Sequence, residues 1–199
     1  AQYGFDLKLG TQGTKSVAAY GRWGEVIGDW AVSASGIYAD IFPYYNFFGV
    51  GNETTRDEEL EDADYYRTNY KGISMAVDLR KVFLEKSSFK AGIHFEEFQT
   101  IIRSNSILQD LPWITGATDD LSIAGAFAQL DLDFRNGSVY ATKGTRLFAH
   151  YQSDWILNKK NAAYGNFKMF VEQYASVDPV TLAFRAGGGL VYGDSIPFF

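Results

Sequence analysis

Apolar and polar residues alternate one by one along most of this chain, which is the period of a β-strand and not of a helix. In ISMAVDLR, residues 73–80, the odd-numbered residues are apolar and the even-numbered ones are small or charged. The same alternation recurs in FKAGIHFE, residues 89–96, and in VTLAFR, residues 180–185. Since successive side chains of a strand point to opposite faces, each segment has one apolar and one polar face. The chain is therefore predicted to be all-β.

The alternating segments predict about nine strands, separated by connections rich in turn-forming residues. They cover residues 1–9, 15–23, 29–42, 65–83, 88–103, 121–134, 145–157, 163–177 and 180–193. When the connections are assigned in turn to the two ends of the sheet, both long ones, 43–64 and 104–120, fall at the same end. Long loops at one end and mostly short turns at the other are typical of a bacterial outer-membrane barrel.

The composition of the two faces favours a membrane barrel over a soluble one. One face carries large aromatic and aliphatic residues, whereas the other mixes Gly, Ala and Ser with charges of both signs. A face exposed to solvent would hold fewer Gly and Ala, so the mixture fits a wet interior better. Apolar-out and polar-in alternation in segments of about ten residues predicts an antiparallel transmembrane β-barrel. A soluble lipid-binding barrel remains the alternative fold.

Composition also excludes several classes of function. The chain has no Cys, which removes disulfides and thiolate metal sites. Its net charge of −6 argues against nucleic acid as a partner. It has no run of about 18 apolar residues that could form a transmembrane helix. Neither a Gly-rich phosphate loop nor metal-ligand spacing is present. We therefore predict no catalytic residue, no cofactor, no metal ion and no enzymatic activity.

The acidic tract NETTRDEELEDAD, residues 52–64, lies in one of the long loops. Its seven acidic residues and one arginine give a balance of −6, equal to the net charge of the whole chain. Carboxylates could bind Ca²⁺ or join lipopolysaccharide phosphates through divalent ions. The tract lacks the spacing of an EF-hand, and a solvated extracellular loop is the preferred interpretation.

The two histidines, His94 and His150, are both predicted on the polar face. His94 is close in sequence to Glu96, and His150 to Ser153 and Asp154. Residues two apart on a strand are separated by about 7 Å, too far for a nucleophile and its base. Hydrogen-bonded interior residues are therefore preferred over a hydrolase site.

Three stretches resemble the bacterial surface antigen family, which contains the BamA/TamA-type barrels of the outer membrane. DFRNGSVYATKGTRLFAHY, residues 133–151, is similar to the family's Asp-Arg…Gly-Thr-Arg turn, although the usual Pro before Gly144 is missing. FFGVGNET, residues 47–54, is similar to its Phe-Gly-x-Gly-Asn segment, and GGGLVYGDSIPFF, residues 187–199, to the strand before its Pro-Phe stretch. The resemblance marks nine structural residues, Gly49, Gly51, Asn52, Asp133, Arg135, Gly144, Arg146, Pro197 and Phe198.

The resemblance implies a barrel of sixteen strands, of which residues 1–199 would form one outer-membrane domain, incomplete at both ends. It also implies insertion or translocation of proteins at the bacterial outer membrane, alone or as the barrel of a fused enzyme. The implied partners are outer-membrane lipid, lipopolysaccharide, accessory lipoproteins and client outer-membrane proteins. A passive channel or structural barrel is the alternative function. A channel would show one sign of charge in its interior, whereas both signs are predicted here.

Overall fold

The computed structural model describes residues 1–10, 14–40, 45–48, 56–62, 64–102, 105–111 and 120–197. Four of the nine residues that the family resemblance marks, Gly49, Gly51, Asn52 and Phe198, lie outside these ranges. The other five are on the strands, turns and connections described below.

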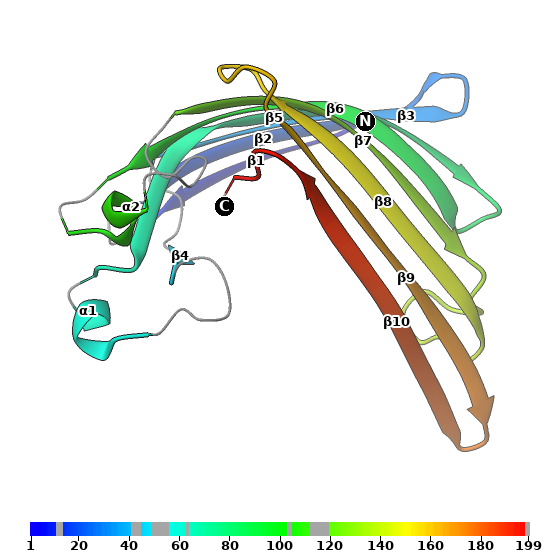
Figure 1. Ribbon diagram of the computed structural model, residues 1–199. Coiled ribbons are helices and arrows are strands. Elements are labelled where there is room, and N and C mark those ends of the chain that lie inside the picture. Colours follow the sequence, from blue (N-terminus) through cyan, green and yellow to red (C-terminus); the bar gives the residue numbers. More distant parts are fainter. Residues whose placement is uncertain are drawn as a thin grey trace.

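Nine long strands form one antiparallel sheet in which each strand pairs with its neighbours along the chain (Figure 1). The strands are β1 Gln2–Leu9, β2 Lys15–Ile27, β3 Trp30–Asp40, β5 Arg67–Phe83, β6 Ser87–Ile101, β7 Leu121–Asp133, β8 Gly144–Ile156, β9 Ala163–Val177 and β10 Val180–Gly193. The predicted all-β class and antiparallel order are confirmed. Figure 1 shows the sheet curved into an arch. Among the described residues, β1 pairs only with β2 and β10 only with β9, so no pairing closes the sheet into a barrel.

The structure corrects the predicted segments in a few places. β2 continues to Ile27 rather than ending near Trp23, through an irregularity in its register with β3. Glu25 takes a positive φ of 54° there, which lets the strand bend before the turn at Gly28. The two long connections, predicted as loops, contain the short helices α1 Glu58–Asp62 and α2 Ile107–Asp110, and the short strand β4 Tyr45–Asn46 pairs with β5.

Local hydrogen bonds explain why the helices form in the loops. The Asp57 carboxylate accepts hydrogen bonds from the backbone N–H groups of Glu59 and Leu60. The Ser106 hydroxyl accepts one from Leu108 at the start of α2. Side chains of this kind satisfy N–H groups that have no partner in the first helical turn. Such caps act over two or three residues, which is why strand periodicity did not indicate them.

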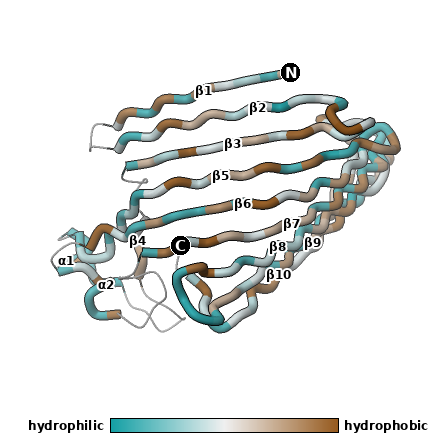
Figure 2. Tube along the Cα trace, turned by 90° about the horizontal axis from the view of Figure 1, so that it is seen from above, coloured by the Kyte–Doolittle hydropathy of each residue, from teal (hydrophilic) through white to brown (hydrophobic). Residues whose placement is uncertain are grey.

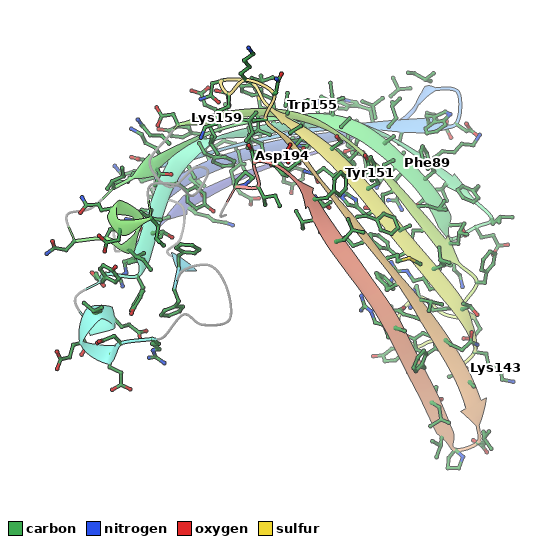
Figure 3. The ribbon with its side chains drawn as sticks, viewed as in Figure 1. Phe89, Lys143, Tyr151, Trp155, Lys159 and Asp194 are labelled. Atoms are coloured by element: carbon green, nitrogen blue, oxygen red, sulfur yellow. The ribbon has the colours of Figure 1, made fainter. Side chains whose placement is uncertain are left out.

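The register places large exposed apolar residues on one face and most of the charged residues on the other, although the second face also carries apolar residues such as Ile123 and Phe127. Along one row across the sheet, Ala34 lies opposite Val77, which lies opposite Ile93. Figure 2 shows apolar and polar residues alternating along the strands. Tyr151 and Trp155 share the apolar face of β8, and Lys159 follows in the next connection (Figure 3).

The two faces differ in burial: the apolar face is largely exposed, whereas the polar face buries several charges together with the apolar cluster of Phe98, Leu121, Ile123 and Ile156. On the apolar face Ile93 is 65% exposed and Val77 48% exposed. On the polar face Asp154 is fully buried, and Glu172 is 8% exposed. Soluble proteins bury apolar side chains and expose charged ones, which are almost never fully buried unless paired. The sheet therefore shields its charges and presents its apolar surface outward.

The polar face is the concave face of the arch. Residues 194–197, which follow β10, lie inside the arch in Figure 1. There Ile196 and Pro197 border a pocket together with Tyr164, Asn166 and Lys168 of β9. These three residues alternate with the apolar residues of β9, so they belong to the polar face. Pro197, one of the marked residues, is buried in this position.

The described parts of the two long connections pack together into a small cluster at one end of the sheet. Tyr66, Ile107 and Leu108 are its buried centre, and Phe47 and Phe48 pack against them. The backbone N–H of Ile107 donates to the carbonyl of Tyr65 at 3.0 Å. The Tyr65 hydroxyl donates to the Asp110 carboxylate at 2.6 Å, which joins the first connection to α2.

We expect Tyr65→Phe to weaken this cluster and to abolish its sensitivity to alkaline pH. The Asp110 carboxylate, followed by partial burial, raises the pKa of Tyr65 to about 12. A raised pKa stabilises the folded form below the ordinary tyrosine value of about 10, and the effect disappears as pH rises from there to about 12. Loss of this hydrogen bond costs about 1 kcal/mol. Hydrogen exchange at the Ile107 amide at neutral pH measures the weakening, and tyrosinate absorbance measures the missing titration.

Tyr140→Phe is the matched control for this prediction, because Tyr140 is 89% exposed and lies in a connection at the other end of the sheet. It should leave the exchange rate of Ile107 unchanged. Equal effects of the two substitutions would show that the Tyr65–Asp110 contact does not hold the cluster together.

Candidate functional site: the polar face of the sheet

Two arginine–aspartate pairs lie where β7 and β8 meet the 134–143 connection. The Arg135 guanidinium donates to both carboxylate oxygens of Asp133, at 2.8 and 2.7 Å. Arg146 does the same to Asp131, at 2.9 and 2.7 Å. Two-point arginine–carboxylate contacts fix orientation as well as distance. Asp133 raises the pKa of Arg135 above its already high ordinary value, so the guanidinium stays charged.

Glu172 of β9 connects these pairs to β10. Its carboxylate lies 3.5 Å from Arg135 and 4.0 Å from Arg146, and its other oxygen lies 3.5 Å from Arg185. The Arg185 guanidinium also stacks on the Phe170 ring, 3.9 Å from its centre. We call this set the arginine cluster: Asp131, Asp133, Arg135, Arg146, Glu172 and Arg185. Its three acids balance its three arginines, so it is built to neutralise itself and not to attract an ion.

Gly144 is required by the backbone beside the arginine cluster. Its φ is +107°, a conformation that residues with a side chain rarely adopt. A Cβ at Gly144 would overlap the carbonyl oxygen of Phe134 and lie 2.7 Å from the Cα of Arg135. The glycine thus allows the chain that enters β8 to pass close to the residue that carries the arginine.

The turn is also tied to the neighbouring β5–β6 connection. The Lys86 ammonium donates to the carbonyl of Arg135 at 2.6 Å, and the backbone N–H of Asp133 donates to the buried Ser87 hydroxyl at 3.0 Å. Asp133, Arg135, Gly144 and Arg146, which the family resemblance marks, therefore meet at one place in the fold. What the sequence did not indicate is the central position of Glu172, which is separated from them by a whole strand.

A second polar group lies further along the same face, where His94 of β6 meets Asp154 of β8. The His94 Nε2 and Asp154 Oδ1 atoms are 2.9 Å apart, although β7 separates the two strands. Gly125 of β7 lies directly opposite both residues in the register. A Cβ at Gly125 would overlap Asp154 and His94. A glycine on the middle strand thus lets two side chains meet above it.

The residue that His94 contacts, Asp154, is not one of its neighbours in the sequence. Glu96 accepts a hydrogen bond from the Ser74 hydroxyl at 3.2 Å instead. Gln152 donates to the second oxygen of Asp154 at 2.9 Å, and the Phe127 ring lies between the two histidines, stacked with His150 and tilted against His94. His94 therefore lies at ion-pair distance from a carboxylate two strands away, but its Nε2 atom and Asp154 Oδ1 form no hydrogen bond, so the predicted hydrogen-bonded role is not confirmed. Gly125 is the residue that sequence reasoning missed, because its role depends on pairing that a single strand does not reveal.

The chemistry available on this face is that of paired charges. A pocket of about 260 Å³ lies beside the two histidines and is lined also by Lys90, Glu96 and Phe127. In the described ranges no hydroxyl donates to either histidine, so a nucleophile activated by a base is not assembled there. No group of three His, Cys, Asp or Glu side chains in the described part of the chain could hold a metal ion.

Comparison with known proteins places this chain in no established group: no family model, no curated protein and no solved structure matches it. No helix among the described residues is both long and apolar enough to span a membrane. The functional interpretation is therefore based on the fold and on the polar face of the sheet.

Proposed function

We propose that this chain is part of the wall of an outer-membrane β-barrel that takes part in insertion or translocation of proteins. The observation that carries the proposal is the exposure of one apolar face together with the burial of charges on the other, with Ile93 65% exposed and Asp154 fully buried. A solvent of hydrocarbon favours this arrangement, because it accepts apolar side chains and excludes charges. The curved sheet then encloses a polar interior.

The spacing of the lysines that bound the apolar surface matches a bilayer. On β5 the apolar residues between Ile73 and Leu79 are bounded on the same face by Lys71 and Lys81. The apolar residues themselves span about 20 Å of strand; the two bounding lysines are about 33 Å apart along it, and a strand tilt of about 40° reduces this to about 25 Å across the membrane. Outer-membrane barrels have an apolar band of about this height. We assign the long connections to the extracellular side.

The polar face supports a filled interior more than an open channel. The six residues of the arginine cluster neutralise one another, and His94 and Lys90 pair with Asp154 and Asp78. A ring of unpaired charges of one sign is a common way for a channel to select ions of the other sign. The meeting of Asp133, Arg135, Gly144 and Arg146 in one turn supports the resemblance to the surface antigen family, and with it a role in protein insertion or translocation.

The membrane proposal is tested by placing single cysteines along β6 of the reconstituted chain, which has no cysteine of its own. Spin labels at 93 and 95 should be accessible to oxygen dissolved in lipid, whereas labels at 94 and 96 should not. A label at 99, beyond the apolar band, is the control and should be accessible to a water-soluble relaxation agent. Lack of the two-residue alternation would exclude a membrane-spanning β6.

Conductance of planar bilayers separates the proposed role from a passive channel. We expect no large steady current from the reconstituted chain, because the interior charges are paired. A steady current that reverses its ion selectivity when Arg185 is replaced by Glu would favour the channel. Arg185 suits this comparison because its side chain is 61% exposed.

A further inference from the structure

One row across the polar face is an exception to the pairing of charges there. Directly opposite one another on neighbouring strands lie Arg80 of β5, Lys90 of β6, Gln129 of β7, His150 of β8 and Lys168 of β9. Neighbouring strands are about 4.8 Å apart, so these five residues cover about 19 Å of the concave surface. We call the four basic residues, Arg80, Lys90, His150 and Lys168, the basic row.

The basic row keeps a surplus of positive charge. Lys90 lies 3.3 Å from the Asp78 carboxylate, and Arg80 donates to the neutral Ser88 hydroxyl at 3.4 Å. Apart from the contact of Lys90 with Asp78, the basic row forms no ion pair with the described residues. Three lysine and arginine charges against one carboxylate therefore leave a surplus of two positive charges.

Two further carboxylates near the basic row are held by other residues. Glu96 borders the pocket beside the histidines but accepts a hydrogen bond from Ser74. Asp131 follows Gln129 on the same face of β7, and Arg146 holds it at two points. The surplus is therefore not cancelled by these neighbours.

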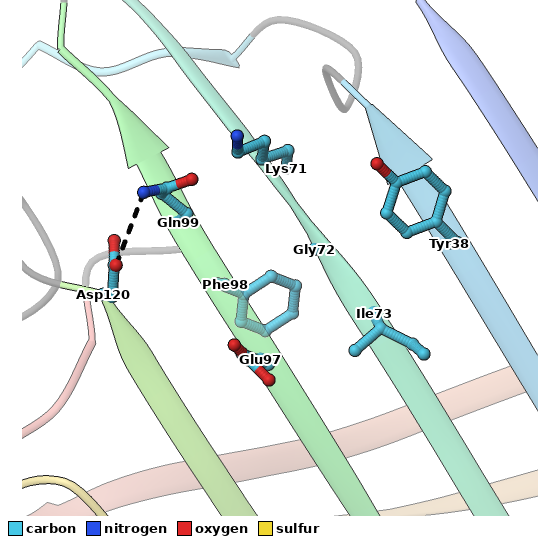
Figure 4. Close-up of a pocket in the computed structure, with 8 residues that line it drawn as sticks. All are labelled: Tyr38, Lys71, Gly72, Ile73, Glu97, Phe98, Gln99 and Asp120. Carbon is cyan, nitrogen blue, oxygen red and sulfur yellow. Dashed lines mark hydrogen bonds between the residues drawn. The ribbon is translucent and has the colours of Figure 1, made fainter.

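The loop end of the sheet has the opposite balance of charge. A pocket of about 520 Å³ lies there between β3, β5 and β6 (Figure 4). It is lined by two acidic residues, Glu97 and Asp120, and by one basic residue, Lys71. An anionic ligand is therefore attracted by the basic row and not by this pocket.

Two pockets give a ligand room beside the basic row. The pocket of about 260 Å³ is lined by Lys90 and His150, and a pocket of about 610 Å³ is lined by Lys168. Gly189 of β10 lies opposite Lys168 and has no side chain that could fill the larger pocket. The basic row is therefore open to a ligand over β6, β8 and β9.

Asn166, which lines the larger pocket together with Lys168, indicates which kind of anion fits. Its side-chain oxygen is buried and has no hydrogen-bond partner among the described residues. This oxygen accepts hydrogen bonds, as the oxygens of a carboxylate or phosphate do, so a simple anion is a poor match for it. A polypeptide offers both groups, because acidic side chains carry the charge and the backbone supplies N–H donors.

We propose that the basic row binds an acidic segment of an extended polypeptide, with carboxylates on Arg80 and Lys168 and a backbone N–H on Asn166. Side chains on one face of an extended peptide are about 7 Å apart, so three carboxylates fit along the row. This inference rests on the proposed function in protein insertion or translocation. It deepens that function by naming the chemistry of the polypeptide segment that the interior receives.

The test uses the full chain reconstituted in nanodiscs of phosphatidylcholine, a lipid without net charge, and a fluorescent peptide of about seven residues that alternates Asp with Ser. Fluorescence anisotropy measures its affinity. We expect a peptide with Asn in place of Asp to bind about tenfold more weakly or less. Lys168→Gln should weaken binding of the acidic peptide about two- to fivefold, the effect of one exposed charge contact. Asn166→Ala should weaken binding of the peptide but not of inorganic phosphate.

Lys15→Gln is the matched control, because Lys15 is an exposed lysine on the opposite, apolar face of the sheet. It should leave the affinity unchanged. An equal loss with Lys15→Gln, no loss with Lys168→Gln, or equal binding of the Asn peptide would overturn the proposal. Inorganic phosphate that competes as strongly as the acidic peptide would also overturn it, because the basic row would then be a site for small anions.

The accessibility of the β6 spin labels distinguishes failure of the basic row from failure of the membrane proposal. A chain that shows the two-residue alternation but no preference for the acidic peptide is a membrane wall without a peptide site. A chain without the alternation fails both proposals.

Discussion

Replacing His94 with Ala is expected to destabilise the chain by about 3–5 kcal/mol, because it leaves the fully buried Asp154 without its partner. Gln152 would still donate to one carboxylate oxygen but carries no charge. Equilibrium unfolding in denaturant from lipid vesicles measures the change. His150→Ala is the matched control, since His150 is on the same face and forms no ion pair with a carboxylate among the described residues. It should cost about 1 kcal/mol or less.

Gly125→Ala should cause most of the same loss of stability, although neither His94 nor Asp154 is replaced. The added Cβ would overlap His94 and Asp154, so the two side chains must part. The losses of Gly125→Ala and His94→Ala should therefore not add when the substitutions are combined. Gly36→Ala is the control on another inner strand, where the nearest atom to a Cβ would be 3.8 Å away. Full additivity would show that Gly125 does not act through the pair.

Gly144→Ala is expected to cost about 3 kcal/mol or more. The positive φ alone costs on the order of 1–3 kcal/mol for a residue with a side chain. The Cβ would also overlap backbone atoms of Phe134 and Arg135, which cannot rotate away as a side chain can. Movement of Arg135 should loosen its contact with Asp133, so cleavage by trypsin after Arg135 should accelerate. Urea unfolding and trypsin digestion measure the two effects.

Gly188→Ala provides the comparison for Gly144→Ala, because a Cβ at Gly188 would meet nothing within 4 Å. It should change the free energy of unfolding by about 0.5 kcal/mol or less. If Gly144→Ala behaved like Gly188→Ala, the 134–143 turn would be tolerant of side chains, and the argument that it fixes the arginine cluster would be lost.

Strand periodicity was sufficient to predict the sheet, because a period of two residues is repeated over many residues in every strand. The predicted segments 163–177 and 180–193 coincide with β9 and β10. The bend that extends β2 to Ile27 was missed, since an irregularity of one or two residues interrupts no long pattern. The helices were missed for a related reason: α2 is four residues long, too short for a helical period to appear.

The candidate site was less predictable than the fold. Asp133, Arg135, Gly144 and Arg146 lie close together in sequence, and a turn brings them into contact. Glu172 and Asp154 join their partners only through the register between strands, which fixes distances that no single segment encodes. Alternation placed these residues on the correct face. It could not say which charges meet.

The contact above Gly125 also bears on how accurately the strands align during assembly. A two-residue shift of β7 against both neighbours would keep its apolar and polar faces but would bring Ile123 or Phe127 between His94 and Asp154. Either side chain would block the contact and leave the buried Asp154 carboxylate without His94. Hydrophobic alternation cannot distinguish shifts by an even number of residues. The contact of His94 with Asp154 above Gly125 therefore favours the native register over registers shifted by two residues, in which the apolar and polar faces would be unchanged.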